Sequence, residues 1–482
     1  MNTILVYPQL EFSGLQLATP PYSILFIADY IRRNGIDVEV FDMRFDNIRD
    51  LIRTISLRDP EYIGISVMTG PQIYFALNIS EMIKTRFPEK KIVWGGIHPT
   101  ILPTQTLKNK VIDYVIRGEG EKSYYSLISG VNKKRIKGLS LKSSRIIYHN
   151  PDAELLLKSD LNNLTIPWDI IDHQNYIKRG NFNMISSRGC PYRCAFCYNT
   201  LFNNFWRGWT AEKTIEELKK VQQFGAKKIV FYDDNFFAGK KRIEPLYEFF
   251  KNESIEWKAE IRVDQLNNKF AKRAKKHGCA QLFFGAESGS QRILDILNKN
   301  ITVKDILNSA KITSEVDLFA EYSWMIGIPG EKWRDVQKTI AVIKKIQELN
   351  SNCEFSIKIM YPYPKTPIYT QAIKQGHTPP SSLIEWGKIR REVAPDYLNN
   401  RKLLEMISIT SAVIGKKLFE ENDIPILKLV RFLANLRWKT EVFNVGIENA
   451  FFKLFRKIIE NFISDKGSDE YDAFEHRIVS RK

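Results

Sequence analysis

The chain has 482 residues, too many for one ordinary domain, so its length predicts two to four domains. Hydrophobic residues make up 44% of it and aromatic residues 12%, which excludes a disordered protein. The formal net charge of +17 admits anionic partners, but Lys and Arg are spread along the chain, and no basic block interleaved with aromatics predicts a nucleic-acid groove.

The N-terminal residues do not predict a secretory signal, because the apolar run Ile4–Tyr7 is short and Pro8 follows it at once. No uncharged apolar segment reaches about 18 residues, so no membrane-spanning helix is expected. Five cysteines in so long a chain do not predict a disulfide framework. We therefore expect a cytoplasmic protein.

Residues 1–128 alternate short apolar strands with helices, which predicts a doubly wound parallel sheet. Pro20 and Pro21 open an amphipathic helix that ends at Gly35, and a further helix is predicted over Ile73–Arg86. Ligands of such sheets bind at the carboxyl ends of the strands. The predicted strands are Thr3–Tyr7, Val38–Phe41, Tyr62–Val67, Lys91–Trp94 and Tyr114–Ile116.

Residues 129–180 are predicted to be a linker with a small hairpin at Leu139–Tyr148. From Asn181 the alternation restarts, and residues 181–375 contain six strand–helix repeats, which predict a partial (β/α)6 TIM-like barrel. In such barrels the chemistry lies on the loops after the strands. The predicted barrel strands are Phe182–Ser186, Lys228–Tyr232, Glu256–Ile261, Ala280–Gly285, Tyr322–Ile326 and Glu354–Met360.

Residues 376–482 lose the alternation and are predicted to be helical. Within them Ile424–Ile463 is both hydrophobic and basic. Two interpretations stay open: a packed helical cap, or a surface for a lipid or for peripheral contact with a membrane.

Three of the five cysteines, Cys190, Cys194 and Cys197, follow the first predicted barrel strand with C-x3-C-x2-C spacing. Thiolates this dense on one loop can reach three corners of one iron–sulfur cube. Three ligands for four irons leave one iron open to a substrate or co-substrate. Phe196, between the second and third cysteines, can shield the cluster from water.

Other interpretations of the cysteines are weaker. Structural zinc needs four protein ligands, and the nearest candidate for the fourth, His173, has no zinc-finger spacing. A thioredoxin-like redox pair needs only two cysteines. Cys279 and Cys353 are predicted to be core thiols at strand starts.

The cysteine loop resembles that of the radical S-adenosylmethionine (SAM) superfamily. The resemblance implies a [4Fe–4S] cluster whose open iron is chelated by the amino and carboxylate groups of SAM. The reduced cluster, served by an external electron donor, then splits SAM into methionine and a 5′-deoxyadenosyl radical. The implied SAM contacts are Phe196, then Asp233, Asp234 and Asn235 after the second strand, Arg262 after the third, Glu287 and Ser288 after the fourth, and Gly327 and Pro329 after the fifth.

The N-terminal domain resembles the cobalamin-binding domain of one branch of that superfamily. Its Ser66–Thr69 turn and its Gly95-Gly96 pair are similar to the family's nucleotide-tail site, where missing side chains let the tail insert. The family's cobalt-ligating motif Asp-x-His-x-x-Gly is absent from Tyr7–Gly14. The sequence therefore leaves open cobalamin without a His ligand, or a domain that binds none. The implied contacts are Ser66, Met68, Thr69, Gly95, Gly96 and His98, the last being favoured as a packing residue rather than a cobalt ligand.

The resemblance covers residues 1–375 and implies a cobalamin-dependent enzyme that methylates an unactivated carbon of a small-molecule or lipid-like substrate. The alternative within the same branch is a radical cyclisation, rearrangement or carbon–carbon coupling, on a lipid or a tetrapyrrole, without methyl transfer. A third hypothesis, an RNA-modifying enzyme, is supported by net charge alone.

Overall fold

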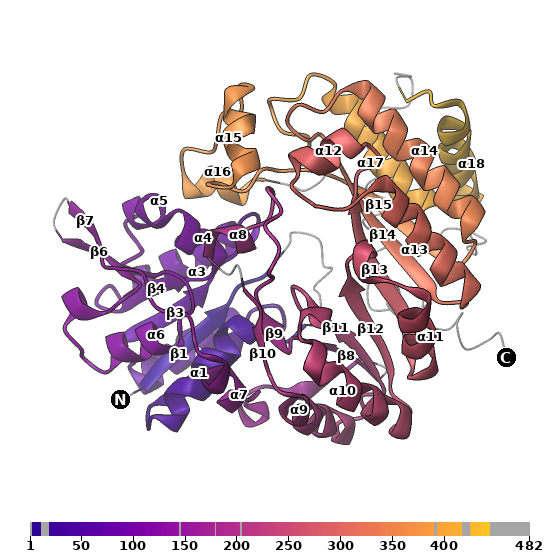
Figure 1. Ribbon diagram of the computed structural model, residues 1–482. Coiled ribbons are helices and arrows are strands. Elements are labelled where there is room, and N and C mark those ends of the chain that lie inside the picture. The colour runs from indigo at the N-terminus through magenta and orange to yellow at the C-terminus, as the bar shows by residue number, and fades with distance from the viewer. Residues whose placement is uncertain are drawn as a thin grey trace. The chain divides into compact units, whose positions relative to one another are not determined.

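The computed structural model describes residues 2–10, 19–143, 146–178, 180–202, 205–389, 393–416 and 425–443. They form two compact units, each assembled from separated segments of the chain. The first unit comprises Met1–Lys178, Arg207–Phe224 and Pro379–Arg390. The second comprises Arg179–Trp206, Gly225–Thr378 and Arg391–Lys482. Each unit is built on a sheet with five or more parallel strands (Figure 1).

The sheet of the first unit has the strand order β2-β1-β3-β4-β5-β6-β7. Strands β1 to β5 run parallel, which confirms the predicted doubly wound sheet. The winding direction reverses between β1 and β3, so the loops after these two strands flank the position where such sheets bind ligands. The parallel strands are β1 (Asn2–Tyr7), β2 (Asp37–Asp42), β3 (Tyr62–Ser66), β4 (Lys91–Gly95) and β5 (Tyr114–Ile116).

Nine helices of the described residues belong to the first unit. The first begins after Pro20 and Pro21 and is followed by Gly35 at φ +79°, as predicted. The helix over Ala211–Gln223 is capped by Thr210, whose hydroxyl accepts a 3.2 Å bond from the Lys213 N–H. The nine are α1 (Tyr22–Arg33), α2 (Ile48–Arg58), α3 (Gln72–Arg86), α4 (Ile97–Ile101), α5 (Pro103–Lys108), α6 (Glu121–Ile128), α7 (Lys158–Asn163), α9 (Ala211–Gln223) and α16 (Leu383–Gly387).

The segment 129–180, predicted to be a linker, is part of the first unit up to Lys178. Its predicted hairpin consists of β6 (Leu139–Ser143), which pairs antiparallel with β5, and β7 (Ile146–His149), which pairs antiparallel with β6. Leu156, Leu161 and Leu164 are at most 3% exposed. Burial of these apolar side chains attaches the segment to the unit. The leucines show no strand or helix periodicity in the sequence, so their burial was not predicted.

The sheet of the second unit has the strand order β15-β14-β13-β12-β11-β8, all parallel. Sequential order of six parallel strands is what the predicted partial (β/α)6 barrel requires. One side of every strand is buried. Helices α11 (Asn268–Lys276), α13 (Val303–Glu315) and α17 (Arg401–Ile414) lie against β13, β14 and β15, respectively. The strands are β8 (Asn181–Met184), β11 (Lys228–Phe231), β12 (Glu256–Ile261), β13 (Cys279–Glu287), β14 (Phe319–Ile326) and β15 (Cys353–Ile359).

The helices described in the second unit include two from the predicted helical C-terminal region, α17 and α18. Predictions for residues beyond Phe443, including the remainder of Ile424–Ile463, lie outside the described residues. Among the described helices, none is long and apolar enough to cross a membrane. The helices are α8 (Asn199–Phe202), α10 (Lys240–Asn252), α11 (Asn268–Lys276), α12 (Gln291–Ile296), α13 (Val303–Glu315), α14 (Trp333–Leu349), α15 (Pro367–Lys374), α17 (Arg401–Ile414) and α18 (Pro425–Thr440).

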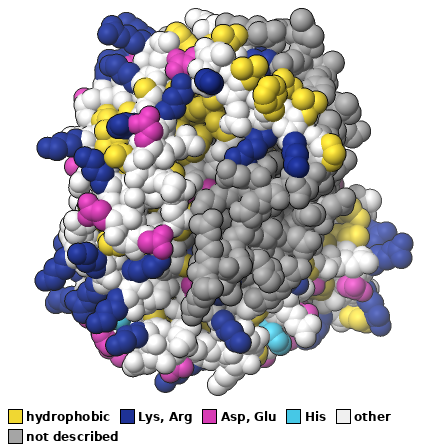
Figure 2. All heavy atoms as spheres, turned by 90° about the vertical axis from the view of Figure 1, so that its right-hand side faces the viewer, with side chains coloured by type: hydrophobic (Ala, Val, Ile, Leu, Met, Phe, Trp, Pro, Cys, Tyr) yellow, Lys and Arg dark blue, Asp and Glu magenta, His cyan; other side chains and the backbone are white. Residues whose placement is uncertain are grey.

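The Lys and Arg side chains of the described residues occur at several separate places, rather than in one patch, on the face drawn in Figure 2. On the face drawn in Figure 2, basic side chains of the described residues are separated by uncharged and acidic ones. The net charge of +17 is therefore not concentrated into one groove on this face.

Candidate functional site

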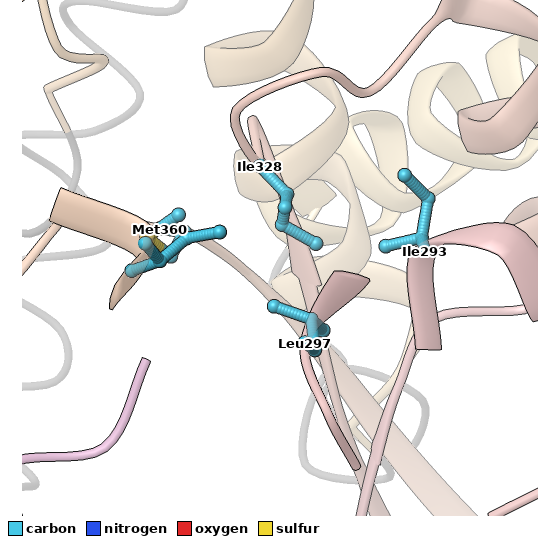
Figure 3. Packing of buried hydrophobic residues seen from close by; sticks show 5 residues of the cluster. Ile293, Leu297, Ile328 and Met360 are labelled. Atoms are coloured by element: carbon cyan, nitrogen blue, oxygen red, sulfur yellow. The ribbon is translucent and has the colours of Figure 1, made fainter. Parts of the chain in front are cut away.

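The cysteine loop follows β8 and a two-residue strand, β9 (Ser187–Arg188), at the carboxyl edge of the second sheet. Backbone bonds pin its centre on two sides: the Ala195 N–H donates to the Leu297 carbonyl at 2.8 Å, and the Ala195 carbonyl accepts from the Ile368 N–H at 3.2 Å. Phe196 packs against a buried apolar cluster formed by Ile293, Leu297, Ile328, Met360 and Ile368 (Figure 3).

The three thiols lie near enough to influence one another electrostatically. Burial raises the pKa of Cys194, while the positive charges of Lys299 and Arg262 oppose this. Burial raises the pKa of Cys197 to about 12, with Cys190 and Cys194 adding to the effect. Among the described residues no three His, Cys, Asp or Glu side chains converge on one point as ligands of a single ion. Three cysteine thiols on one loop are the kind of donor set that an iron–sulfur cluster takes.

Asp233, predicted to contact SAM, is only 1% exposed and is directed at the start of the cysteine loop. Its carboxylate accepts hydrogen bonds from the N–H and hydroxyl of Ser186, both at 3.1 Å, and from the Ser187 hydroxyl. Arg242 lies 3.8 Å from it and donates to the Ser186 hydroxyl at 2.8 Å. Because these donors occupy the carboxylate, the structure gives Asp233 a positioning role rather than a free face toward a ligand.

Arg242 is held between two aromatic rings behind the cysteine loop. Its guanidinium carbon lies 5.0 Å from the ring centre of Trp206 and 4.9 Å from that of Phe236. The residue is 5% exposed, and burial lowers its pKa while Asp233 opposes that shift. Arg242 also donates to the carbonyls of Ser186 and Phe236, both at 3.3 Å, so it joins the start of the cysteine loop to the segment after β11.

Asp234 and Asn235 contact the cysteine loop itself. One Asp234 oxygen accepts from the Gly189 N–H at 2.9 Å, and the other accepts from the Tyr198 hydroxyl at 3.2 Å, so one carboxylate joins both ends of the loop. The Asn235 amide donates toward the Cys190 sulfur at 3.8 Å. Hydrogen bonds to ligand sulfurs are one of the means by which proteins set cluster potentials.

Arg262, predicted to contact SAM, lies over the aromatic ring within the cysteine motif. Its guanidinium carbon is 3.7 Å from the ring centre of Tyr192, a cation–π contact. The guanidinium also donates to Asp264 at 3.0 Å and to the Lys299 carbonyl at 2.8 Å. Arg262 thus ties β12 to the loop between Cys190 and Cys194.

Glu287 ends β13 with a backbone φ of +63°, at an irregularity in its register with β14. A non-glycine residue in this region is strained by about 1–3 kcal/mol, which is typical of functional sites. Its carboxylate pairs with Lys299 at 2.7 Å, with both side chains at most 10% exposed. Ser288, by contrast, is fully buried, and its hydroxyl lies 3.3 Å from that of Thr339.

The turn after β14 is closed by a residue within it. One Glu331 oxygen accepts from the Gly327 N–H at 2.6 Å, and the other is buried without a hydrogen-bond partner among the described residues. Burial raises the pKa of Glu331 to about 8. Gly327 adopts φ +77°, which favours glycine, and Pro329 is buried beside it.

Glu260 is a titratable residue that sequence reasoning missed. It lies on the central strand β12, where its neighbours Ala259 and Ile261 are buried on the opposite side. Its side chain remains in contact with water, although protein atoms surround most of it. This partial enclosure and the nearby charge of Asp234 raise the pKa of Glu260 to about 7, and Lys299 opposes the shift.

The raised pKa predicts a pH-dependent effect of Glu260→Gln on stability. An ordinary Glu pKa of 4.5 becomes about 7 in the folded state, so ionisation penalises folding increasingly between these values and fully above 7. The variant should therefore gain more in melting temperature at pH 8 than at pH 5, measured by thermal unfolding. The exposed Glu253→Gln variant is the control. Equal gains at both pH values would contradict the assignment.

In the first unit the residues implied for cobalamin lie at the carboxyl ends of β3 and β4. Gly96 has φ +95°, and a Cβ there would lie 2.8 Å from the backbone N and O of Val67. Its missing side chain lets two backbone turns meet, rather than making room for a ligand as predicted. At Gly95 a Cβ would make only an ordinary van der Waals contact, 3.8 Å from the Ile116 carbonyl oxygen, so a side-chain carbon is not excluded there.

The side chains implied for cobalamin binding near the ends of β3 and β4 are uncharged. The Ser66 hydroxyl lies 2.8 Å from that of Ser23, and the Met68 N–H donates to Gln72 at 2.7 Å. His98 is fully buried, contacts Thr69 at 3.3 Å through Nδ1, and has its pKa lowered to about 3 by burial. Ser66 at the carboxyl end of β3, beside the reversal of the sheet, fits a contact with the tail of a cobalamin, and the neutral, buried imidazole of His98 fits a packing residue.

Two stretches of the chain match known protein families. Residues 15–128 match the B12 binding domain, and residues 184–343 match the radical SAM superfamily. The chain is 32% identical over 390 residues to the uncharacterized methyltransferase PH0819 of Pyrococcus horikoshii, covering 77% of this chain and 83% of that protein.

Other similarities are more distant. The anaerobic magnesium-protoporphyrin IX monomethyl ester cyclase of Rubrivivax gelatinosus is 25% identical over 363 residues, 70% of this chain and 65% of that one. The structure of the cobalamin-dependent S-adenosylmethionine radical enzyme OxsB with aqua-cobalamin bound has the same fold, with a TM-score of 0.73, 17% identity, and coverage of 97% of this chain and 76% of that one.

Proposed function

Because this chain belongs to the radical SAM enzymes that carry a cobalamin-binding domain, we propose that it methylates an unactivated carbon of a small-molecule substrate. The family is the one that the sequence predicted. The observation that carries the proposal is the presence, in one chain, of a three-cysteine loop after the first strand of one sheet and a parallel sheet that matches the B12 binding domain. The relative that is 32% identical is named as a methyltransferase.

In this proposal each cofactor has its own residues. Cys190, Cys194 and Cys197 in residues 181–375 would hold a [4Fe–4S] cluster, and the turn at Gly95 in residues 1–128 would hold cobalamin. When bound, the cluster supplies the electron that cleaves SAM to a 5′-deoxyadenosyl radical, and cobalamin carries the methyl group. An external donor must deliver the electron.

The chain's own residues position the co-substrate and exclude water. Asp234 holds the two ends of the cysteine loop, and Phe196 closes its apolar side against the cluster of Figure 3. The Glu287–Lys299 pair offers a carboxylate and an ammonium at the end of β13, groups that complement the charged ends of an amino acid. The Gly327–Pro329 backbone suits the flat adenine.

The second candidate is a radical cyclisation or coupling without methyl transfer, which the similarity to the cyclase favours. One experiment separates the two. The protein is reconstituted anaerobically with iron, sulfide and hydroxocobalamin, desalted, and assayed with SAM and a chemical reductant in the presence of candidate substrates. About four irons and one cobalt per chain are expected, with both 5′-deoxyadenosine and S-adenosylhomocysteine as products. Turnover that forms 5′-deoxyadenosine without S-adenosylhomocysteine would favour the second candidate.

Gly95→Leu is expected to lower cobalamin retention at least tenfold while iron content stays unchanged. The leucine would project from the end of β4, where its Cβ would meet no atom nearer than the Ile116 carbonyl oxygen at 3.8 Å, and would compete with the cobalamin tail for that position. Cobalt and iron are measured by elemental analysis after desalting.

The matched control is Gly35→Leu, since Gly35 precedes β2 at the amino edge of the same sheet and has open space around it, although its φ of +79° adds strain. Full cobalt retention in Gly95→Leu would overturn the placement of the site.

We also propose a peripheral membrane contact through α18. Leu429, Phe432 and Leu436 are 47–63% exposed at helical spacing, beside the exposed Lys439. After sedimentation with anionic vesicles, the wild type should be found in the vesicle pellet. A Phe432→Ser, Leu436→Ser variant should stay in the supernatant. Equal recovery of both proteins would exclude this contact.

A further inference from the structure

We propose that the segment Ala394–Leu398, outside the barrel repeats, completes the SAM site, with Tyr397 as the residue that positions the turn after β14. The inference rests on the proposed function, because it assigns the Gly327–Pro329 turn to SAM. It gives a role to part of the C-terminal region, for which the sequence offered none.

The segment contacts the turn directly. The Tyr397 hydroxyl donates to the Gly327 carbonyl at 2.7 Å, and Tyr397 is 8% exposed. A Cβ built at Gly327 would lie 2.8 Å from the Leu398 side chain, so Leu398 packs against the glycine. Glu331 accepts from the Gly327 N–H, and Tyr397 donates to the Gly327 carbonyl. Both backbone polar groups of Gly327 are therefore hydrogen-bonded, one within the turn and one to the segment.

The segment is itself anchored at three points. One Asp396 oxygen is hydrogen-bonded to Nδ1 of His377, and the other accepts from the Thr378 N–H at 2.9 Å. The Ala394 N–H donates to Glu405 on α17 at 3.0 Å. The His377 ring is 5% exposed and meets the rings of Tyr361, Tyr369 and Tyr397 edge-on. These contacts leave Tyr397 little freedom to move away from the turn.

The position of the turn matters because the residue after Gly327 faces the cysteine loop. Ile328 belongs to the apolar cluster that also packs against Phe196 (Figure 3). Loss of the Tyr397 hydroxyl would leave a buried carbonyl without this donor and let the turn relax. The backbone that we assign to adenine would then be displaced, while the cysteines and their hydrogen bonds would be untouched.

The test is Tyr397→Phe in the reconstituted full-length protein. Its dissociation constant for radiolabelled SAM, and KM for SAM, should rise about three- to tenfold, with kcat at saturating SAM and iron content unchanged. Tyr369→Phe is the control, because its ring borders the same imidazole but its hydroxyl donates to no group among the described residues. If Tyr397→Phe is unstable, Leu398→Ala is tested in its place, with the same expectation.

The outcomes are distinguishable from a failure of the proposed function. If the wild type neither binds nor cleaves SAM, the proposed function is wrong. If the wild type cleaves SAM and the Tyr397→Phe variant binds it equally well, or if the variant loses iron in proportion to SAM binding, the positioning role is overturned.

Discussion

Cys194→Ala is expected to lose the cluster and with it all 5′-deoxyadenosine formation. A cube held by three cysteines cannot keep its site-differentiated iron when one ligand is removed, and Cys194 is the buried one, at 9% exposed. Iron content and the absorbance of the reconstituted protein should fall to background, and product formation should drop by at least a thousandfold. Chromatography of the reaction products checks this.

The control for this variant is Cys353→Ala, which removes a cysteine from the start of β15 and should keep full iron content. Cobalt retention by Cys194→Ala should equal that of the wild type, because Gly95 and its surroundings belong to the other unit. Residual 5′-deoxyadenosine formation by Cys194→Ala would refute the ligand assignment.

Arg242→Met is expected to lower the free energy of unfolding by about 3–5 kcal/mol, because it leaves the buried Asp233 carboxylate without its cationic neighbour. The same carboxylate holds Ser186 and Ser187 at the entrance to the cysteine loop, so iron retention should fall as well. Chemical denaturation of the apo-protein gives the first quantity, and iron per chain after reconstitution gives the second.

A surface ion pair nearby supplies the comparison. Arg273 pairs with Glu244 where both side chains are more than 40% exposed, so Arg273→Met should change stability by about 0–1 kcal/mol. If the two arginine variants were equally stable, the pair with Asp233 would not organise the site. In the double variant Arg242→Met, Asp233→Asn, part of the loss should be recovered, since neither charge then remains buried alone.

Much of the fold could be predicted because local patterns carry it. Every predicted strand of both sheets overlaps an observed one, since short apolar runs bounded by Gly, Pro and polar residues leave few alternatives. The cysteine loop could be predicted because its three cysteines lie within eight residues. The family assignment followed from the order of motifs, each at the end of a successive strand.

The remaining features depend on distant parts of the chain. Lys299 looks like one basic residue among many in the sequence, and only the bend at Glu287 brings the two side chains together. Arg242 meets the Ser186 hydroxyl 56 residues away, and Tyr397 meets the Gly327 carbonyl 70 residues away. No periodicity links such positions. The polar residues Asp233 and Ser288 were placed correctly on their loops, but burial, which decides what they can bind, is a property of the packed structure.

The assembly of the first unit from three separated segments affects how the protein folds during synthesis. Its three segments end at Lys178, Phe224 and Arg390, so a ribosome must translate most of the chain before the unit is complete. Trp209 packs against Phe26, and Trp386 packs against His98, each joining a late segment to an early one. A nascent N-terminal domain would therefore expose these apolar surfaces while the second unit is being made. The two units must mature together, and a fragment that ends at residue 178 would lack two of the tryptophans that bury its core.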